Sequence, residues 1–184
     1  MLSQTPKLHF YLDGIVEVQI TEEMLKAAHI RAERMGKLKN SITGGEGNVA
    51  GFLGEYITLA LIPGARLVDD YDYDLITPTG LTIDAKTCRT NIKPRETYNA
   101  QVAHHNITQD TDVYAFTRIK NDFSVGWLCG WIYPYHFYQK AEKREKGFVR
   151  DDGGGKIFKY PESCYEMPIR DLKKFKPGHS ICCG

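Results

Sequence analysis

Residues 73–86 read YDLITPTGLTIDAK, a run in which apolar and polar side chains alternate on both sides of a turn signal. Proline near the start of the turn and glycine at its end, Pro78 and Gly80, are typical of a tight turn in which the glycine takes the left-handed backbone conformation. We therefore expect a β-hairpin whose loop is residues 78–80. One strand, 73–77, leads into this loop and another, 81–87, leaves it.

The apolar residues of the hairpin fix which side chains face each other across it. With a three-residue loop, Leu75 pairs with Ile83 and Asp74 pairs with Asp84. Because side chains alternate between the two faces of a strand, this register gives one apolar face and one charged face. The apolar face holds Tyr73, Leu75, Leu81, Ile83 and Ala85, and the charged face holds Asp74, Asp84 and Lys86. A loop one residue shorter would put Asp74 on the apolar face and break the pattern.

Two carboxylates directly opposite each other, with Cβ atoms about 5 Å apart, repel each other unless a positive charge neutralises them. A divalent cation is the natural neutraliser, and ligation by oxygen atoms alone favours Mg²⁺ or Mn²⁺ over zinc. Lys86 shares the face of Asp84, where its ammonium group can orient or help deprotonate an attacking water and stabilise negative charge on a phosphate. The alternative is a plain hairpin in which Lys86 forms a surface salt bridge with Asp72 or Asp84.

Two helices are predicted before the hairpin. Residues 21–38 begin with the potential cap Thr21 and carry an apolar stripe at helical spacing, formed by Met24, Ala28, Ala32, Met35 and Leu38. Residues 48–62 begin with the potential cap Asn48 and end at a Pro-Gly pair. In this second helix Glu55 lies nearly opposite the apolar stripe. It therefore faces either solvent or a second layer of structure in which its charge is used.

The remaining elements indicate an α/β fold with a mixed central sheet flanked by helices. Further strands are expected over residues 65–68, 113–119 and 124–132. A helix is expected over residues 95–107, after a proline, and a short basic helix over residues 169–175 closes the chain.

Length and composition predict one globular domain over residues 1–184. The chain has 42% hydrophobic and 26% charged residues, which excludes wholesale disorder. No window approaches the roughly 18 apolar residues of a membrane span, and the first residues carry no apolar secretory segment. We expect a cytoplasmic, intracellular protein whose five cysteines are reduced thiols.

Charge is divided unevenly along the chain. Residues 1–88 carry 8 Lys or Arg against 12 Asp or Glu, whereas residues 89–184 carry 16 against 11. An enzyme that holds a cation against a polyanion needs both kinds of charge, although chance segregation of surface charge gives the same division. Arg89, Lys93 and Arg95 directly follow the strand that carries Lys86, where a nucleic-acid backbone leaving the site would pass. They are the predicted DNA-binding residues, and contacts to phosphate position DNA without reading its sequence.

The acidic residues and the lysine fall in an order that a known nuclease family shares. They are Glu55 on a helix, Asp74 on a strand, and Asp84, Ala85 and Lys86 on the next strand. This pattern resembles the PD-(D/E)xK, or restriction-endonuclease-like, nuclease superfamily. The resemblance covers residues 48–132, with the helix 21–38 before this core and a basic C-terminal extension after it. It departs from the family pattern at Tyr73, which stands where the family has proline.

The resemblance implies a restriction-endonuclease-like core and a role for each of these residues. Asp74 and Asp84 would bind one or two Mg²⁺ ions, for which Mn²⁺ can substitute. Glu55 would be an additional ligand or a carboxylate just outside the ligands, and the main-chain carbonyl of Ala85 a further ligand. Lys86 would be the catalytic lysine that assists attack of water on a phosphodiester.

The expected function is that of a Mg²⁺-dependent deoxyribonuclease, an endonuclease rather than an exonuclease, although the motif itself does not separate the two. Gln101, on the predicted helix 95–107, is a candidate supporting residue, and a polar surface residue is the alternative reading of it. Two other functions stay open: a catalytically inactive DNA-binding module on the same fold, and a metal-dependent nuclease that acts on RNA. A homodimer is plausible because cutting both strands often needs two sites.

Overall fold

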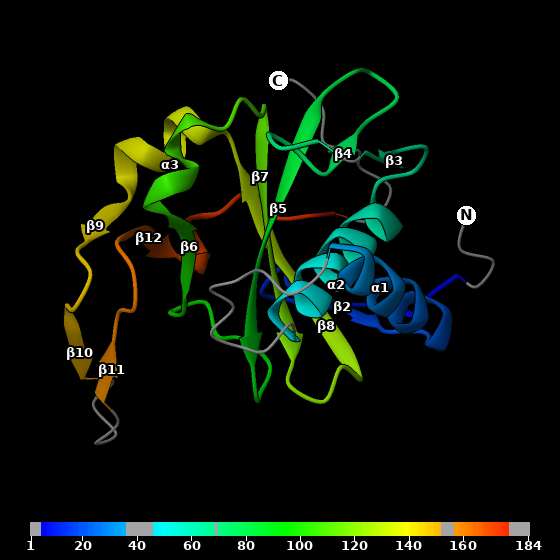
Figure 1. The fold of residues 1–184 in the computed structure, drawn as a ribbon, viewed down its shortest axis with the longest axis horizontal. Coiled ribbons are helices and arrows are strands. Elements are labelled where there is room, and N and C mark those ends of the chain that lie inside the picture. Colours follow the sequence, from blue (N-terminus) through cyan, green and yellow to red (C-terminus); the bar gives the residue numbers. More distant parts are fainter. Residues whose placement is uncertain (1–4, 36–45, 69, 152–156, 177–184) are drawn as a thin grey trace.

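The computed structural model describes residues 5–35, 46–68, 70–151 and 157–176. These residues form an α/β fold on a seven-stranded central sheet with the strand order β1-β2-β8-β7-β5-β4-β3 (Figure 1). The strands are β1 (Leu8–Phe10), β2 (Val16–Gln19), β8 (Val125–Ile132), β7 (Val113–Lys120), β5 (Thr82–Thr90), β4 (Leu75–Ile76) and β3 (Arg66–Leu67). The pairing of β5 with β7 is parallel and the others are antiparallel, so the predicted mixed sheet is confirmed.

The predicted hairpin has the expected register. Leu75 pairs with Ile83, and both side chains are fully buried. The N–H of Thr77 donates to the C=O of Leu81 at 2.9 Å, which closes a loop of three residues. Gly80 has a φ of +88°, the left-handed conformation that glycine adopts without strain. The hydrophobic pattern therefore selected the correct alignment of the two strands.

Two helices cover one face of the central sheet (Figure 1). They are α1 (Glu22–Met35) and α2 (Glu46–Leu61). The hydroxyl of Thr21 accepts a hydrogen bond from the N–H of Met24 at 3.2 Å, so the predicted cap of α1 is confirmed. Helix α2 packs against both α1 and the sheet, and residues such as Leu53 and Ile57 are fully buried in that cluster. Being covered on two sides, α2 buries much more than a single stripe.

Smaller elements cover the other side of the sheet (Figure 1). A three-stranded sheet has the order β6-β12-β9, and β10 pairs with β11 in a separate two-stranded sheet. These elements are β6 (Asn99–Ala103), α3 (Pro134–Lys140), β9 (Glu142–Arg144), β10 (Val149–Asp151), β11 (Ile157–Lys159) and β12 (Cys164–Pro168), with single 3₁₀ turns at His104–Thr108 and Ile169–Asp171.

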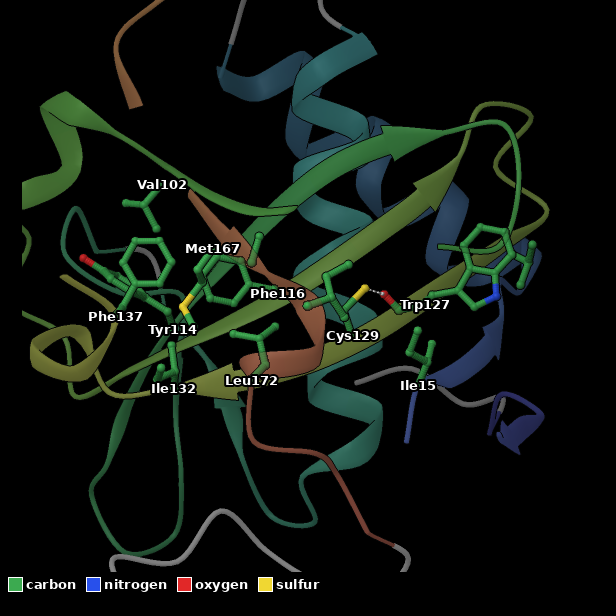
Figure 2. Packing of buried hydrophobic residues seen from close by; sticks show 13 residues of the cluster. Ile15, Val102, Tyr114, Phe116, Trp127, Cys129, Ile132, Phe137, Met167 and Leu172 are labelled. Carbon is green, nitrogen blue, oxygen red and sulfur yellow. Dashed lines mark hydrogen bonds between the residues drawn. The ribbon is translucent and has the colours of Figure 1, made fainter. Parts of the chain in front are cut away.

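An aromatic core joins these smaller elements to the central sheet (Figure 2). Phe116 of β7 stacks on Phe137 of α3 with ring centroids 5.5 Å apart, and Tyr114 meets Phe137 edge-on at 5.9 Å. Met167 of β12 is buried in the same cluster. Burying each such side chain is worth about 1.5–3 kcal/mol, so β7 is held from both faces.

The helix predicted over residues 95–107 is wrong. Residues Asn99–Ala103 form strand β6, and Ala100 and Val102 alternate with less buried neighbours. Strand β6 pairs with β12, more than sixty residues further along the chain, with Ala100 opposite Met167. Five residues of alternation are a weak signal, and the strand that decides their conformation is remote in sequence.

Smaller predictions also need correction. Asn48 does not cap the second helix, because α2 already begins at Glu46. Met35 is 54% exposed instead of continuing the apolar stripe of α1, and residues 36–38 of that predicted helix lie outside the described residues. The closing basic helix is a single 3₁₀ turn, after which Lys173 pairs with Trp131 in an isolated β-bridge. Strands β1, β2, β6, β9, β10, β11 and β12 and helix α3 were not predicted.

Two further features of the described residues are the length and hydrophobicity of the helices and the state of the cysteines. In the described ranges no helix is both long enough and apolar enough to cross a membrane. Cys88, Cys129 and Cys164 are free thiols, as predicted. The other two cysteines, Cys182 and Cys183, lie outside the described residues.

The glycines of α2 give a matched test of how this helix packs on β5 and β7. A Cβ at Gly54 would overlap the hydroxyl of Thr87 and lie 2.6 Å from that of Thr117, whereas a Cβ at Gly51 would meet nothing within 4 Å. We expect Gly54→Ala to lower the free energy of unfolding by about 1–3 kcal/mol through overpacking. Gly51→Ala should raise it by up to about 1 kcal/mol through helix propensity. Urea denaturation measures both, and equal effects of the two substitutions would contradict the packing of α2 on β5 and β7.

Candidate functional site

The hairpin brings two carboxylates together at the point where β4 stops pairing with β5. Asp74 directly precedes β4, and Asp84 lies within β5 and is 5% exposed. The two carboxyl groups are close enough to share a hydrogen bond. The predicted juxtaposition of Asp74 and Asp84 is therefore present.

The carboxylate of Asp74 extends the hydrogen bonding between β4 and β5, because it accepts the hydrogen bond that a main-chain carbonyl would otherwise accept. Its Oδ2 accepts a hydrogen bond from the N–H of Ala85 at 2.8 Å. The N–H and C=O of one residue point to the same side of a strand, so the carbonyl of Ala85 lies on the same edge of β5 as Asp74. Three oxygen-bearing groups thus gather where the hairpin strands separate: two side chains and one main-chain carbonyl.

Glu55 reaches this region from α2. It is 6% exposed, and its Oε2 lies 2.5 Å from Nη1 of Arg31 on α1. Of the two predicted alternatives, the second layer is confirmed and the solvent-facing position is wrong. The guanidinium group of Arg31 also lies over the ring of Phe52, 4.1 Å from its centroid, so α1 supplies a positive charge in a fixed position.

Lys86 faces the same site from β5. Its Nζ lies 2.5 Å from Oδ2 of Asp84 and 2.7 Å from Oε1 of Gln109. The side chains of Lys86 and Asp84 are only 11% and 7% exposed, so this pair is buried and is not the surface salt bridge of the plain-hairpin alternative. Gln109 in turn donates from Nε2 to the C=O of Tyr71 at 2.7 Å. No pattern in the sequence predicts a role for Gln109, because it lies in a loop twenty-three residues after Lys86.

Burial raises the pKa of all three carboxyl groups. Burial and the nearby charge of Asp74 raise the pKa of Glu55 to about 8, against the opposing effect of Arg31. Burial raises the pKa of Asp84 to about 6, although the ammonium group of Lys86 favours the ionised form. The pKa of Asp74 is also raised, again chiefly by burial. Arg31 and Lys86 therefore compensate the negative charge of the three carboxylates only in part, and a further positive charge at the site would be stabilising.

The donor atoms suit a hard divalent cation. Within the described part of the chain, no three His, Cys, Asp or Glu side chains converge closely enough to enclose an ion as they stand. However, Oδ2 of Asp84 is buried and receives no hydrogen bond of good geometry from the described residues, although Nζ of Lys86 is close. Carboxylate and carbonyl oxygens are the ligands that Mg²⁺ and Mn²⁺ prefer. The chemistry of Glu55, Asp74, Asp84 and Ala85 thus fits such an ion.

The other predicted site residues lie apart from the carboxylates. Gln101 is on strand β6, not on a helix, and its Nε2 donates to Oε2 of Glu166 at 3.1 Å. Arg89 donates to the side chain and the main chain of Asn121 at 3.1 Å. It lies five residues beyond Asp84 along β5, or about 17 Å.

Lys93 and Arg95 follow the end of β5. Nζ of Lys93 lies 2.7 Å from Oδ2 of Asp13 and packs over the ring of Tyr11 at 3.8 Å. Arg95 is exposed. The structure therefore holds Arg89 and Lys93 in contacts within the chain and leaves Arg95 facing solvent.

No protein-family model matches this chain, and no curated protein matches it. The assignment of the site accordingly depends on the geometry of Glu55, Asp74, Asp84 and Lys86, and the resemblance to the PD-(D/E)xK superfamily stays a prediction.

The raised carboxyl pKa values predict how stability changes with pH. A carboxyl group whose pKa is higher in the folded than in the unfolded chain keeps its proton longer when folded, so stability is lost as pH rises. In the presence of a chelator, we expect the free energy of unfolding to fall between about pH 5 and pH 8, and Glu55→Gln to flatten this fall by about 1–2 kcal/mol. Urea denaturation across this range measures the slope.

The matched control is Glu33→Gln, which alters an exposed carboxylate of α1 and should leave the slope unchanged. A wild-type stability that rises or stays level over the range, or equal slopes for Glu55→Gln and wild type, would contradict the burial of this acidic cluster.

Proposed function

We propose that this chain is a metal-dependent nuclease that hydrolyses DNA phosphodiester bonds, most simply as an endonuclease. The observation that supports it best is the buried arrangement of Lys86 beside Asp84 and Asp74, at the place where β4 leaves β5. A buried lysine next to paired carboxylates is costly for stability. Such a cost is common at catalytic sites, where perturbed charges do chemical work.

Each residue has a role in this proposal. Asp74, Asp84 and the carbonyl of Ala85 hold Mg²⁺, with Mn²⁺ as a substitute, and Glu55 is either a further ligand or an outer carboxylate. When bound, the ion supplies polarisation of the phosphoryl oxygen and lowers the pKa of bound water. Lys86 positions the attacking water and stabilises the charge that develops on the phosphate. Oε1 of Gln109 accepts a hydrogen bond from the ammonium group of Lys86 and so helps to hold it, together with the ion pair to Asp84.

The finer fold proposal is a restriction-endonuclease-like core. Helix α2, the β4–β5 hairpin and the β7–β8 pair follow each other along the chain, whereas strand β6 stands where the resemblance has a helix between the hairpin and these strands. Helix α2 lies on the sheet with Gly54 directly over Thr87 and Thr117, which brings Glu55 to the open edge of β5. This close approach places Glu55 near enough to Asp74 and Asp84 for their charges to raise its pKa.

A DNA partner is proposed from the positive charges around the site. Arg31 and Arg34 line a cleft of about 520 Å³ beside α1 and β3, so phosphates approaching Glu55 would meet guanidinium groups. Arg89, Lys93 and Arg95 remain the proposed contacts for a backbone leaving the site. Cutting of both strands often needs two sites, and a homodimer would bring two together.

The direct test is nicking of supercoiled plasmid with Mg²⁺ or Mn²⁺, compared with a chelator. We expect the wild-type chain to nick DNA only with metal. Lys86→Ala and Asp84→Ala should each lower the rate by at least about 100-fold, because they remove the group that positions water and stabilises charge, and a metal ligand. Thermal unfolding should show that both variants are folded. Lys120→Ala is the control. Lys120 is the last residue of β7 and pairs with Asp122 in the turn that follows, so this variant should retain full activity.

Full cleavage by both site variants would contradict the assignment. The same panel, run with RNA, single-stranded DNA and duplex DNA, separates the alternatives. Cleavage of RNA alone would identify a ribonuclease, and salt-sensitive binding without cleavage would identify a DNA-binding module that has lost catalysis.

A further inference from the structure

A cavity of about 440 Å³ opens beside the proposed catalytic lysine, and Lys86 forms part of its wall. Its volume is within the usual range for ligand sites, about 300–1,000 Å³. The rings of Phe158 and Tyr160 and the amide of Gln101 also line it. Phe158 is 52% exposed, and its ring meets that of Tyr160 edge-on with the ring centroids 4.9 Å apart. A flat aromatic surface with an amide at its side suits a planar heterocycle with hydrogen-bonding edges.

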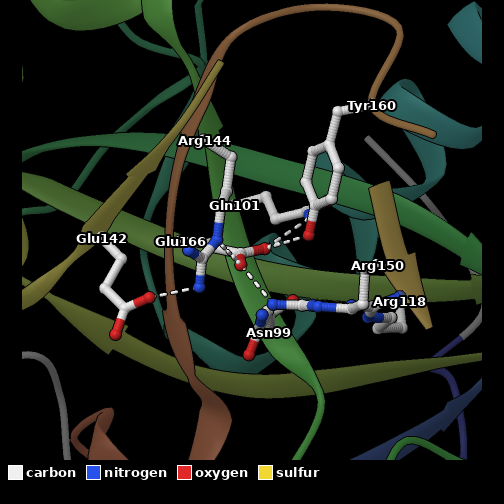
Figure 3. A network of polar contacts seen from close by, with 8 residues as sticks. All are labelled: Asn99, Gln101, Arg118, Glu142, Arg144, Arg150, Tyr160 and Glu166. Atoms are coloured by element: carbon white, nitrogen blue, oxygen red, sulfur yellow. Dashed lines mark hydrogen bonds and ion pairs between the residues drawn. The ribbon is translucent and has the colours of Figure 1, made fainter. Parts of the chain in front are cut away.

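The wall of this cavity is fixed by a buried carboxylate, Glu166 of β12 (Figure 3). Glu166 is 2% exposed and accepts hydrogen bonds from Nε of Arg144 at 2.8 Å, from the hydroxyl of Tyr160 at 2.6 Å and from Nε2 of Gln101 at 3.1 Å. Arg150 also pairs with it. Burial alone would raise its pKa, but these hydrogen bonds lower the pKa to about 2. Glu166 is therefore a carboxylate that only accepts hydrogen bonds.

This network determines which end of the Gln101 amide faces the cavity. Because Glu166 accepts only, Gln101 must direct its NH₂ group toward Glu166 and its oxygen away from it. Oε1 of Gln101 then lies beside Cys88, whose Sγ is 3.9 Å away and is a weak donor. Cys88 and Gln101 both line the cavity. The cavity thus presents an oriented acceptor whose partner within the chain is poor.

We propose that this cavity binds an unstacked nucleobase next to the cleaved phosphodiester. Phe158 stacks on the base, and Oε1 of Gln101 accepts a hydrogen bond from an exocyclic amino group such as that of cytosine. Glu166 is a positioning residue, since it acts through Gln101. The inference rests on the nuclease function proposed for Lys86 and its neighbours, and it makes a base with an amino group a preferred neighbour of the cut.

The test is binding of single-stranded DNA in a chelator, where no cleavage occurs. Fluorescence anisotropy would compare oligodeoxycytidine with oligodeoxyuridine of about eight nucleotides, because cytosine presents an amino donor at the position where uracil presents a carbonyl acceptor. We expect the wild-type chain to bind oligodeoxycytidine about three- to tenfold more tightly, the value of one hydrogen bond. Gln101→Leu should remove this preference, chiefly by weakening the binding of oligodeoxycytidine.

Two further variants isolate stacking. Phe158→Ala should weaken binding of both oligonucleotides at least about fivefold, because a stacked base is lost. Ile157→Ala is the matched control: Ile157 is its neighbour on β11, is 73% exposed and does not line the cavity, so affinity should not change. Thermal unfolding establishes that each variant is folded. Gln101→Met, which is close in shape to glutamine, replaces Gln101→Leu if the latter unfolds.

The outcomes separate this inference from the proposed function. Equal binding of the two oligonucleotides by the wild-type chain, retained preference in the Gln101 variants, or equal affinity of Phe158→Ala and Ile157→Ala would overturn the base pocket. If metal-dependent nicking persists in that case, the nuclease function stands. Absence of both nicking and DNA binding in the wild-type chain would overturn both.

Discussion

Two carboxylates face each other across the β4–β5 hairpin because the opposite face of that hairpin must be buried. Leu75 and Ile83 pair and are fully buried. In this register the next residues along the two strands, Asp74 and Asp84, lie next to each other. Any slip of one residue would move the apolar pair to the face of Lys86 and put a charge in the apolar cluster in its place. Hydrophobic burial thus sets an arrangement of like charges that electrostatics alone would disfavour, and the surrounding elements are arranged to accommodate it.

Neighbouring elements supply a partner to each of the three carboxylates of the site. Helix α1 contributes Arg31 to Glu55, strand β5 contributes Lys86 to Asp84, and the N–H of Ala85 donates to Asp74. These partners reduce the repulsion without removing it, since burial still raises the pKa of each of the three carboxyl groups. A cluster that is short of positive charge and rich in oxygen donors is suited to a divalent cation. On our proposal, the instability of the metal-free site is the source of its affinity for the ion.

The sequence predicted the part of the molecule in which the signals are local. The hairpin register, the cap at Thr21 and the mixed sheet needed only alternation, turn chemistry and capping. Strand β6 was predicted as a helix because its partner β12 is remote in sequence. For the same reason Gln101 was predicted on a helix, although it lies on a strand and contacts Glu166. The contacts of Gln109 with Lys86 and of Arg31 with Glu55 were not predicted. Each of these contacts depends on tertiary packing that the spacing of residues in the chain does not reveal.

On our proposal, Asp74 and Asp84 together hold a divalent cation. Isothermal titration of Mn²⁺ into the metal-free chain tests it most directly, with wild type compared with Asp74→Asn and Asp84→Asn at pH 6 and pH 8. We expect the wild-type chain to bind Mn²⁺ more tightly at pH 8, since fewer protons then compete for the buried carboxylates. Either substitution should remove this binding. Mn²⁺ binding of equal strength in the wild type and in both variants, or none in the wild type, would contradict it.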